Sequence, residues 1–315
     1  MNSTLLADKS EASLKRFLNT LSPVDQVGAT ARVEALATRS IKTESKNWAI
    51  DLAIRMVDLT TLEGADTPMK VRALCAKGVY PDPTDLTVPS VGAICVYNDM
   101  VKIARTALDA GGGKNIPVAA VATAFPSGRA SIEVKIQDTK DAITNGASEI
   151  DMVIDRGAFL SGKLGLVFDQ IALIKELCGD KAHLKVILET GELVTLDNVR
   201  KASYLAMLAG ADFIKTSTGK VVPAATAPVV YVMLEAVRDF YKMTGTRIGV
   251  KPAGGIRNTK DAIKQLVLVN EVAGPEWLDP ALFRIGASAL LNDLLMQRMK
   301  MRDGYYASPN YVTLD

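Results

Sequence analysis

The stretch Ala211-Asp-Phe-Ile-Lys-Thr-Ser-Thr-Gly-Lys220 predicts a short buried strand that ends on Lys215 and runs into a glycine-containing loop. A lysine at the end of a buried strand is energetically costly unless its amine has a function. The pattern returns in Ile248-Gly-Val-Lys-Pro-Ala-Gly-Gly-Ile-Arg257, where a strand delivers Lys251. Two ammonium groups at one pocket repel each other, which lowers the pKa of an amine and makes it a nucleophile toward carbonyl groups. The two stretches therefore indicate imine chemistry on a small phosphorylated carbonyl compound.

Outward from these stretches, short β-rich runs alternate with amphipathic helical patterns from about residue 50 onward. This alternation predicts a parallel sheet, and eight repeats predict an α/β fold closed into a (β/α)8 TIM barrel. The alternative is an open doubly wound sheet, which carries its glycine-rich turn after the first strand, whereas here such turns follow the last three. The expected strands are 55–60, 92–97, 117–122, 149–154, 184–189, 212–216, 247–251 and 282–286. Helical patterns between them include 131–145, 166–177, 196–208, 227–242 and 260–269.

We expect three parts along the chain. Residues 1–46 are polar and helical in pattern, which predicts an N-terminal helical extension packed on a larger body. Residues 47–300 would form the barrel, and residues 301–315 a C-terminal tail that contains Tyr305, Tyr306 and Tyr311. The sequence does not say whether the tail reaches the functional site.

Composition narrows the classes of function. The 315-residue chain has a formal net charge of +2 and no basic block, which argues against nucleic acid or anionic membranes as partners. His183 is the only histidine, so a metal site built on imidazoles is excluded, as is a Ser-His-Asp triad that does not use it. Three widely spaced cysteines suit a reducing compartment. Because we find neither a signal-peptide pattern nor an apolar run long enough to span a membrane, we expect a cytoplasmic protein.

Polar residues gather where several expected strands end. Asp58 and Thr60 end the first strand, Cys95 lies in the second and Asp151 in the fourth. Catalytic groups of a closed barrel come from the C-terminal ends of several strands. Each residue alone also fits an ordinary role, since Asp58 can orient a loop, Asp151 can be a structural partner and Cys95 can be a small core residue. Their convergence with two lysines favours an active site.

Glycine-containing loops follow the last three expected strands. They contain Gly219, then Gly254, Gly255 and Arg257, and finally Gly286 and Ser288. Backbone N–H groups without a nearby Cβ bind anions at helix N-termini, and barrel phosphate sites commonly use the loops after strands seven and eight. These loops predict a phosphate site, the alternative being that Gly254 and Gly255 only close a tight turn.

Together, the stretches ADFIKTSTGK, GVKPAGGIR, KVILETGEL and EIDMV resemble the motifs of the deoxyribose-phosphate aldolase family, the class I aldolases that form a Schiff base. The resemblance runs from about Asp58 to Ser288, and the N-terminal extension is similar to that of the family's longer members. It implies a lyase that reversibly cleaves 2-deoxy-D-ribose 5-phosphate to D-glyceraldehyde 3-phosphate and acetaldehyde in deoxyribose phosphate catabolism. It implies no metal or other cofactor, because the lysine imine is the electron sink.

The resemblance also implies a role for each candidate residue. It puts the Schiff base on Lys215, the second amine on Lys251 and the proton relay on Asp151. The implied substrate contacts are Asp58, Thr60, Cys95, Thr218 and Lys220. The implied phosphate contacts are Gly219, Gly254, Gly255, Arg257, Gly286 and Ser288. Ala289 stands where some members have a second serine, so one hydroxyl contact is lost.

Other functions stay open on the sequence alone. A transaldolase or a sugar bisphosphate aldolase would also use a barrel lysine, although no second phosphate site is evident. A non-catalytic phosphosugar-binding protein is expected to lack one of the two lysines, and both are present. A structural or interaction protein is the third alternative. The expected partners are small phosphorylated sugars and aldehydes, and the outer helices would allow a homodimer or a larger homo-oligomer.

Overall fold

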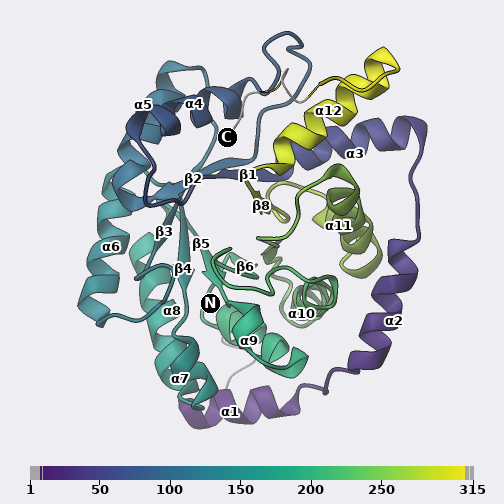
Figure 1. Ribbon diagram of the computed structural model, residues 1–315. Helices are drawn as coiled ribbons and strands as arrows, with labels where there is room; N and C mark the ends of the chain where they lie inside the picture. Colours follow the sequence, from purple (N-terminus) through teal and green to yellow (C-terminus); the bar gives the residue numbers. More distant parts are fainter. Residues whose placement is uncertain (1–7, 9, 309–311, 313–315) are drawn as a thin grey trace.

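The computed structural model describes residues 8, 10–308 and 312. Eight parallel strands form one sheet in the order β7-β6-β5-β4-β3-β2-β1-β8. Parallel bridges from Val250 to Phe283 and from Ala253 to Gly286 join the two ends of this order, and helices surround the strands (Figure 1). The predicted (β/α)8 barrel is thereby confirmed. The strands are β1 Val57–Thr60, β2 Ala93–Tyr97, β3 Val118–Ala122, β4 Glu149–Val153, β5 His183–Ile187, β6 Phe213–Lys215, β7 Gly249–Lys251 and β8 Ile285–Ala287.

Each strand lies close to where the sequence predicted one. The largest shift is at the last strand, which was expected at 282–286 and begins only at Ile285. Phe283 pairs with Val250 through an isolated bridge, so the residues before Ile285 do not form a continuous ladder. The shift leaves Arg284 just outside the strand, which matters for the site.

Helices fill the segments between strands. Several begin at a side-chain cap just after a strand and its loop, as where Thr195 accepts a hydrogen bond from the Asn198 N–H and Asn258 accepts one from the Asp261 N–H. The α-helices are α1 Glu11–Thr20, α2 Gln26–Ala37, α3 Thr43–Met56, α4 Pro68–Val79, α5 Val101–Ala110, α6 Ile132–Thr144, α7 Arg156–Leu160, α8 Leu164–Cys178, α9 Leu196–Leu208, α10 Ala227–Thr244, α11 Thr259–Val272 and α12 Leu290–Asp303. Short 3-10 helices occur at η1 Asn98–Met100, η2 Thr190–Glu192 and η3 Pro275–Trp277. Within the described residues, no helix is both long and apolar enough to cross a membrane.

The N-terminal helices lie along the outside of the barrel (Figure 1). Helix α1 packs on α8 and α9, α2 packs on α10 and α11, and α3 packs on α11 and α12. Helix α3 continues through residue 46 and leads directly into β1, so extension and barrel are joined by one helix. The three-part division of the chain stays a prediction.

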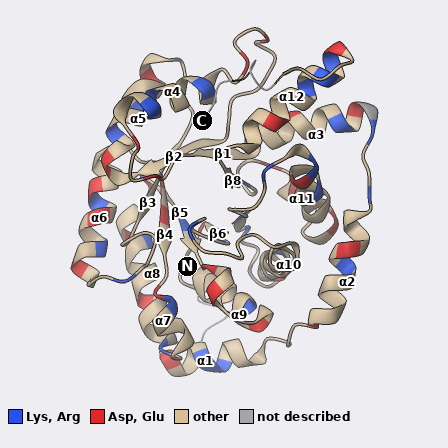
Figure 2. Ribbon diagram, in the orientation of Figure 1, with Lys and Arg blue, Asp and Glu red and all other residues tan. Residues whose placement is uncertain are grey.

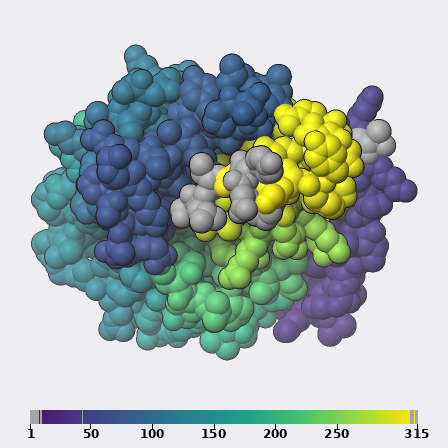
Figure 3. Space-filling view, turned by 45° about the horizontal axis from the view of Figure 1, so that its top comes forward, coloured from purple at the N-terminus to yellow at the C-terminus, as the bar shows by residue number. Residues whose placement is uncertain are grey.

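The C-terminal helix α12 lies on the surface of the molecule (Figure 3). Beyond it, Tyr305 and Tyr306 are exposed, and the Lys300 ammonium lies 3.7 Å from the centroid of the Tyr306 ring. Tyr311 lies outside the described residues.

Two kinds of side chain alternate along the strands. Residues such as Leu59, Ile94, Ile150, Ile214 and Val250 point outward into the main hydrophobic core beneath the helices. Their neighbours point into the barrel, as the two-residue period of a strand requires. Charged residues of both signs are spread over the outer helices (Figure 2), but an unusual number also occupy the barrel interior.

Candidate active site

Among the residues that the structure describes, seven charged side chains are buried inside the barrel. They share inward-facing positions on the strands or, in one case, a position just before β8. They are Asp58, Glu149, Asp151, Lys185, Lys215, Lys251 and Arg284. Burying a charge is unfavourable unless it is paired, so the pairs among these groups determine what the interior can do.

Asp151 is the centre of this group. Its Oδ2 atom lies 2.8 Å from the Lys215 Nζ and 2.7 Å from the Lys251 Nζ, so both amines share one carboxylate oxygen. Its Oδ1 atom lies 3.3 Å from the Lys185 Nζ. The structure therefore brings together the three residues predicted to be catalytic. The sequence predicted repulsion between the two lysines. In the structure the Asp151 carboxylate lies between their amines.

The remaining pairs close into a ring. Lys251 Nζ lies 2.5 Å from Asp58 Oδ2, and Arg284 donates to Asp58 Oδ1 at 2.7 Å and to Glu149 Oε1 at 3.2 Å. Glu149 then pairs with Lys185. Lys185 also pairs with Asp151, which closes the ring. We name this arrangement the charge ring, and its members in order are Asp151, Lys251, Asp58, Arg284, Glu149 and Lys185. Positive and negative groups alternate around it, and Lys215 is the additional cation attached to Asp151.

The charge ring shifts the protonation of its members. Burial alone would raise the pKa of Asp151, but the ammonium groups of Lys215 and Lys251 reverse this and hold it well below its usual range. Burial acts on Asp58 in the same direction, and Lys251 and Arg284 likewise lower its pKa. Burial alone would lower the pKa of Lys251, but Asp151 and Asp58 reverse this and raise it well above its usual value. Asp58 and Asp151 are therefore carboxylates, and Lys251 is a fixed cation.

Lys215 and Lys251 differ in how tightly they are held. Lys251 is fully buried and pairs with two carboxylates, whereas Lys215 is 3% exposed and, among the described residues, pairs with Asp151 alone. Freeing the Lys215 amine for a reaction thus breaks one ion pair, and freeing Lys251 breaks two. The Lys215 amine is therefore the more easily freed of the two.

An aromatic ring closes the interior below the lysines. Phe213 lies two residues before Lys215 on the same face of β6 and is buried. A Cβ at Gly249 would lie 2.2 Å from a carbon of the Phe213 ring, so only glycine fits at this position of β7. Phe213 therefore occupies the space beneath Lys251 that Gly249 leaves open. The ring centroid also lies 5.8 Å from the Lys185 ammonium.

Cys95 belongs to a small apolar cluster inside the barrel. It packs with Leu62, Ala119 and Val121 and is fully buried. Burial raises the pKa of its thiol, and the nearby Lys251 only partly opposes this shift. Cys95 is therefore a neutral thiol that contributes apolar surface beside the charge ring.

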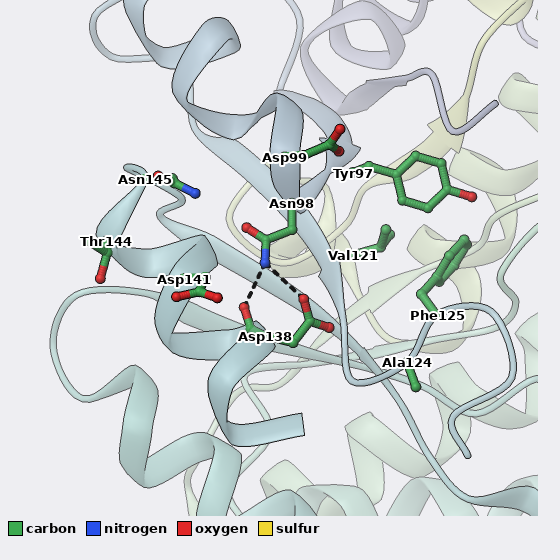
Figure 4. Close-up of a pocket in the computed structure, with 10 residues that line it drawn as sticks. All are labelled: Tyr97, Asn98, Asp99, Val121, Ala124, Phe125, Asp138, Asp141, Thr144 and Asn145. Carbon is green, nitrogen blue, oxygen red and sulfur yellow. Dashed lines mark hydrogen bonds between the residues drawn. The ribbon is translucent and has the colours of Figure 1, made fainter. Parts of the chain in front are cut away.

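A cavity of about 510 Å³ opens next to this cluster (Figure 4). Tyr97 and Phe125 line one side, with ring centroids 5.9 Å apart in an edge-to-face arrangement. Further along, Asn98 donates to Asp138, whose other carboxylate oxygen accepts a hydrogen bond from the Thr123 N–H at 2.7 Å. Because β2 and β3 lie across the barrel from β6 and β7, this cavity lies opposite the glycine-containing loops.

The glycine-containing loops lie at the rim above the lysines. Gly219, Gly254 and Gly255 have φ angles of 81°, 82° and 88°, a left-handed conformation that side chains rarely adopt. A Cβ at Gly254 would lie 3.6 Å from the Gly219 Cα, so the loops after β6 and β7 adjoin. Gly286 lies against the Lys251 side chain, since a Cβ added at Gly286 would lie only 3.3 Å from the Lys251 Cε. These backbones thus meet above the charge ring.

Arg257 and Ser288 are exposed near the same rim. Arg257 precedes α11, and Ser288 precedes α12. Both are therefore accessible to a ligand from solvent, as a phosphate contact requires.

Four of the predicted substrate contacts have partners within the protein, and Asp58 has its partners in the charge ring. The Thr60 hydroxyl donates to the Asp58 carbonyl at 2.7 Å, and Lys220 Nζ lies 2.9 Å from Glu63 Oε1 in an exposed ion pair. The Thr218 hydroxyl donates to Glu189 Oε2 at 2.5 Å. The Thr218 hydroxyl hydrogen is thus already used inside the protein.

Sequence reasoning missed four residues of this region. Glu149 lies two positions before Asp151 on the same inward face of β4. Lys185 lies opposite Asp151 in the register of β4 and β5. For both residues, a charged residue at an inward strand position was the signal that the sequence offered. Arg284 lies just before β8, and nothing local marks it as buried. Glu189 stands in the quoted KVILETGEL stretch, yet no role was assigned to it.

No group of three or more His, Cys, Asp and Glu side chains in the described part of the chain is arranged to hold a metal ion. The interior carboxylates are paired with lysine or arginine instead.

Comparison with known proteins places this arrangement in a family. The profile of the DeoC/LacD family aldolase matches residues 52–295, which include the whole charge ring. A human protein named deoxyribose-phosphate aldolase is 47% identical over 280 residues, which cover 86% of this chain and 87% of the relative. A bovine protein of the same name is 44% identical over 294 residues, covering 90% and 92% of the two chains.

A solved structure shares the fold. The deoxyribose phosphate aldolase of Aeropyrum pernix, described as a tetramer, superposes with a TM-score of 0.60 at 24% identity, covering 81% of this chain and 96% of that one. The barrel, the paired lysines at its interior and the match over most of the sequence agree with the resemblance found in the motifs. The chain belongs to the DeoC/LacD family of aldolases.

Proposed function

We propose that this aldolase is a class I deoxyribose-phosphate aldolase that reversibly cleaves 2-deoxy-D-ribose 5-phosphate to D-glyceraldehyde 3-phosphate and acetaldehyde. The observation that carries the proposal is the pair of buried amines, Lys215 and Lys251, on one oxygen of Asp151. The names of the relatives support the choice of substrate. The glycine-containing loops at the rim support a phosphorylated one.

Lys215 is the proposed nucleophile. Its neutral amine attacks C1 of the open-chain sugar, and loss of water gives an iminium. The iminium withdraws the electrons of the C2–C3 bond, while a base removes the proton of the C3 hydroxyl. The bond breaks to give D-glyceraldehyde 3-phosphate and an enamine on Lys215. Protonation at C2 and hydrolysis then release acetaldehyde and restore the amine.

Asp151 and Lys251 support these steps from fixed positions. Asp151 is the proposed base and proton carrier, because its carboxylate lies 2.8 Å from the Lys215 Nζ. Lys251 stays protonated because its pKa is raised, so it is a fixed cation that stabilises the Asp151 carboxylate. The phosphate would bind at Gly219, Gly254, Gly255 and Gly286, with Arg257, Ser288 and Lys220 nearby, and would orient the sugar without joining the reaction.

Borohydride trapping tests the proposal. The protein is incubated with 2-deoxyribose 5-phosphate and borohydride, digested, and the modified residue is located by mass spectrometry. A reduced adduct on Lys215, its absence in Lys215→Met, and full activity in excess EDTA are the expected results. A stable adduct on another lysine would contradict the assignment of the nucleophile, and loss of activity in EDTA would contradict the metal-free mechanism.

Three wider statements belong to the same proposal. The reaction would serve deoxyribose phosphate catabolism, because its substrate is the sugar phosphate derived from deoxyribonucleosides. The site would work in the cytoplasm, where the free thiols stay reduced. The chain would form a homo-oligomer, as the tetrameric relative suggests, and light scattering of the purified protein checks this.

A further inference from the structure

Glu189 has a conformation and an environment that need an explanation. It follows β5, is fully buried and has a φ angle of 53°, in the left-handed region. A non-glycine residue in this region carries strain of the order of 1 kcal/mol or more and persists only where the surrounding structure fixes it. Burial raises its pKa, and its hydrogen bonds to Thr218 and the charge of Arg156 oppose that shift. The fold thus tolerates both a strained backbone and a buried carboxyl group at this position.

The carboxyl group of Glu189 holds the start of the loop after β6. The Thr218 hydroxyl donates to Oε2 at 2.5 Å, and the Thr218 N–H lies 3.3 Å from Oε1 and 3.4 Å from Oε2. The same hydroxyl accepts a hydrogen bond from the Lys220 N–H at 3.1 Å. The amides on both sides of Gly219 are therefore bound within the protein, which fixes the left-handed turn at Gly219 and the direction of its own N–H.

The segment after Glu189 contacts the same loop at its first residue and near its end. The Thr190 N–H donates to the Thr216 carbonyl at 2.9 Å. A Cβ at Gly191 would lie 2.1 Å from the Pro223 carbonyl oxygen, so the two backbones touch there. Residues 189–191 thus contact the loop at its beginning and near its end, with Gly219 between the two contacts.

A buried carboxylate beside a phosphate site would repel the phosphate if the two were in contact. In Glu189 both carboxyl oxygens are already engaged by Thr218, Oε2 by its hydroxyl and N–H and Oε1 by its N–H. Its influence on a ligand therefore passes through Thr218 and the loop.

We propose that Glu189 is a positioning residue that holds the Gly219 turn through Thr218 and so sets the preference for phosphorylated over unphosphorylated sugar. The inference rests on the proposed function and deepens it. It also changes the expected role of Thr218, whose hydroxyl braces the loop rather than binding the substrate. Misplacing a binding group by about 1 Å can cost up to about 100-fold in rate, so the effect is measurable.

The kinetic test compares two substrates that differ only in the phosphate. Values of kcat/KM are measured for 2-deoxyribose 5-phosphate and for 2-deoxyribose in the wild type, Glu189→Gln, Glu189→Ala and Thr218→Val. We expect Glu189→Ala and Thr218→Val to lower kcat/KM for the phosphorylated sugar by about 10- to 100-fold, mainly through KM, and to leave kcat/KM for deoxyribose within about threefold. Thr218→Ser keeps the hydroxyl and should restore most of the preference, and the isosteric Glu189→Gln should lie between wild type and Glu189→Ala. Equal losses on both substrates, or no loss on either, would overturn the proposal.

We call the contacts of residues 189–191 with the loop after β6 the brace. A second pair of variants shows whether an effect comes from disturbing the brace or from replacing any glycine. Gly191→Ala should reduce the preference, because the added methyl group displaces Pro223 and with it the loop. Gly64→Ala is the matched control, since an added Cβ there meets nothing within 4 Å. An equal effect of the two substitutions would contradict the brace.

Binding of inorganic phosphate, measured by calorimetry, keeps the inference testable without catalysis. The dissociation constant should rise at least about tenfold in Glu189→Ala and stay unchanged in Gly64→Ala. Wild-type protein that binds phosphate but cleaves neither sugar would refute the proposed function alone. Unchanged phosphate affinity in folded Glu189→Ala and Glu189→Gln would refute the role of Glu189 alone.

Discussion

The charge ring lies below the glycine-containing loops with Gly219, Gly254, Gly255 and Gly286, which we call the glycine rim. The two regions are built in opposite ways. The ring consists of side chains that are buried and paired with one another, whereas the rim consists of backbone that carries few side chains and is partly exposed. Charges that must hold a protonation state benefit from a buried, preorganised setting. A phosphate benefits from backbone N–H groups that it can approach closely. In the proposed reaction the charge ring would carry the chemistry and the glycine-containing loops would bind the phosphate, and each region can be altered without the other.

The largest effect is expected from changing Asp151, whose Oδ2 atom pairs with both Lys215 and Lys251. Asp151→Asn leaves Lys215 and Lys251 on a neutral oxygen and removes the proposed proton carrier. We expect kcat to fall by about 10²- to 10⁴-fold and the free energy of unfolding to fall by about 3–5 kcal/mol. Steady-state kinetics and urea unfolding measure the two quantities, and activity within tenfold of wild type would disprove the central place of this carboxylate.

Arg284, which pairs with Asp58 and Glu149 in the charge ring, should contribute to the stability of the fold. Arg284→Met leaves Asp58 and Glu149 without a shared cation, which should lower the free energy of unfolding by about 3–5 kcal/mol. The double variant Glu149→Gln/Arg284→Met removes one of the stranded charges and should be more stable than the single one. Arg302→Met is the exposed control and should leave the free energy of unfolding nearly unchanged, because its ion pair with Asp303 is solvated. Equal losses at Arg284 and Arg302 would show that the ring does not act as a buried network.

The charge ring should also make the fold sensitive to acid. The pKa values of Asp58 and Asp151 are lowered in the folded protein, so the unfolded chain binds more protons below a pH of about 4. Their contribution is complete above that pH and is lost as the pH falls toward the folded values. Urea unfolding between about pH 6 and pH 3 should show a steep loss of stability in the wild type and a shallower one in Asp58→Asn. Parallel curves would contradict the lowered pKa of Asp58.

The smallest effect is expected at the exposed rim. The pair between Lys220 and Glu63 is partly solvated, so Glu63→Gln should change the free energy of unfolding by at most about 1 kcal/mol, and less at high salt. Thermal unfolding at two salt concentrations measures this. A loss as large as that of Arg284→Met would remove the distinction between rim and ring.

Local pattern was enough to predict the strands, the paired lysines and Asp151. Each strand is marked by its own short apolar or β-rich run, and each lysine is followed by its own glycine-containing loop, so no long-range information was needed. The charge ring could not be predicted in this way, because Arg284 meets Asp58 and Glu149 across sequence separations of 226 and 135 residues. Those pairs exist only once the barrel has closed and its register is set. The brace at Glu189 was missed for a related reason, since its partner Thr218 belongs to the next loop along the barrel.

The Phe213 ring against Gly249 has a kinetic consequence. Because its ring is buried against Gly249 beneath the lysines, molecules would reach Lys215 and leave it through the same mouth of the barrel. For the proposed reaction, the aldehyde end of the sugar must enter first and the phosphate end last. The phosphorylated product then has to depart before the two-carbon fragment can be hydrolysed and follow it. Release would be ordered, and product-inhibition patterns would record that order.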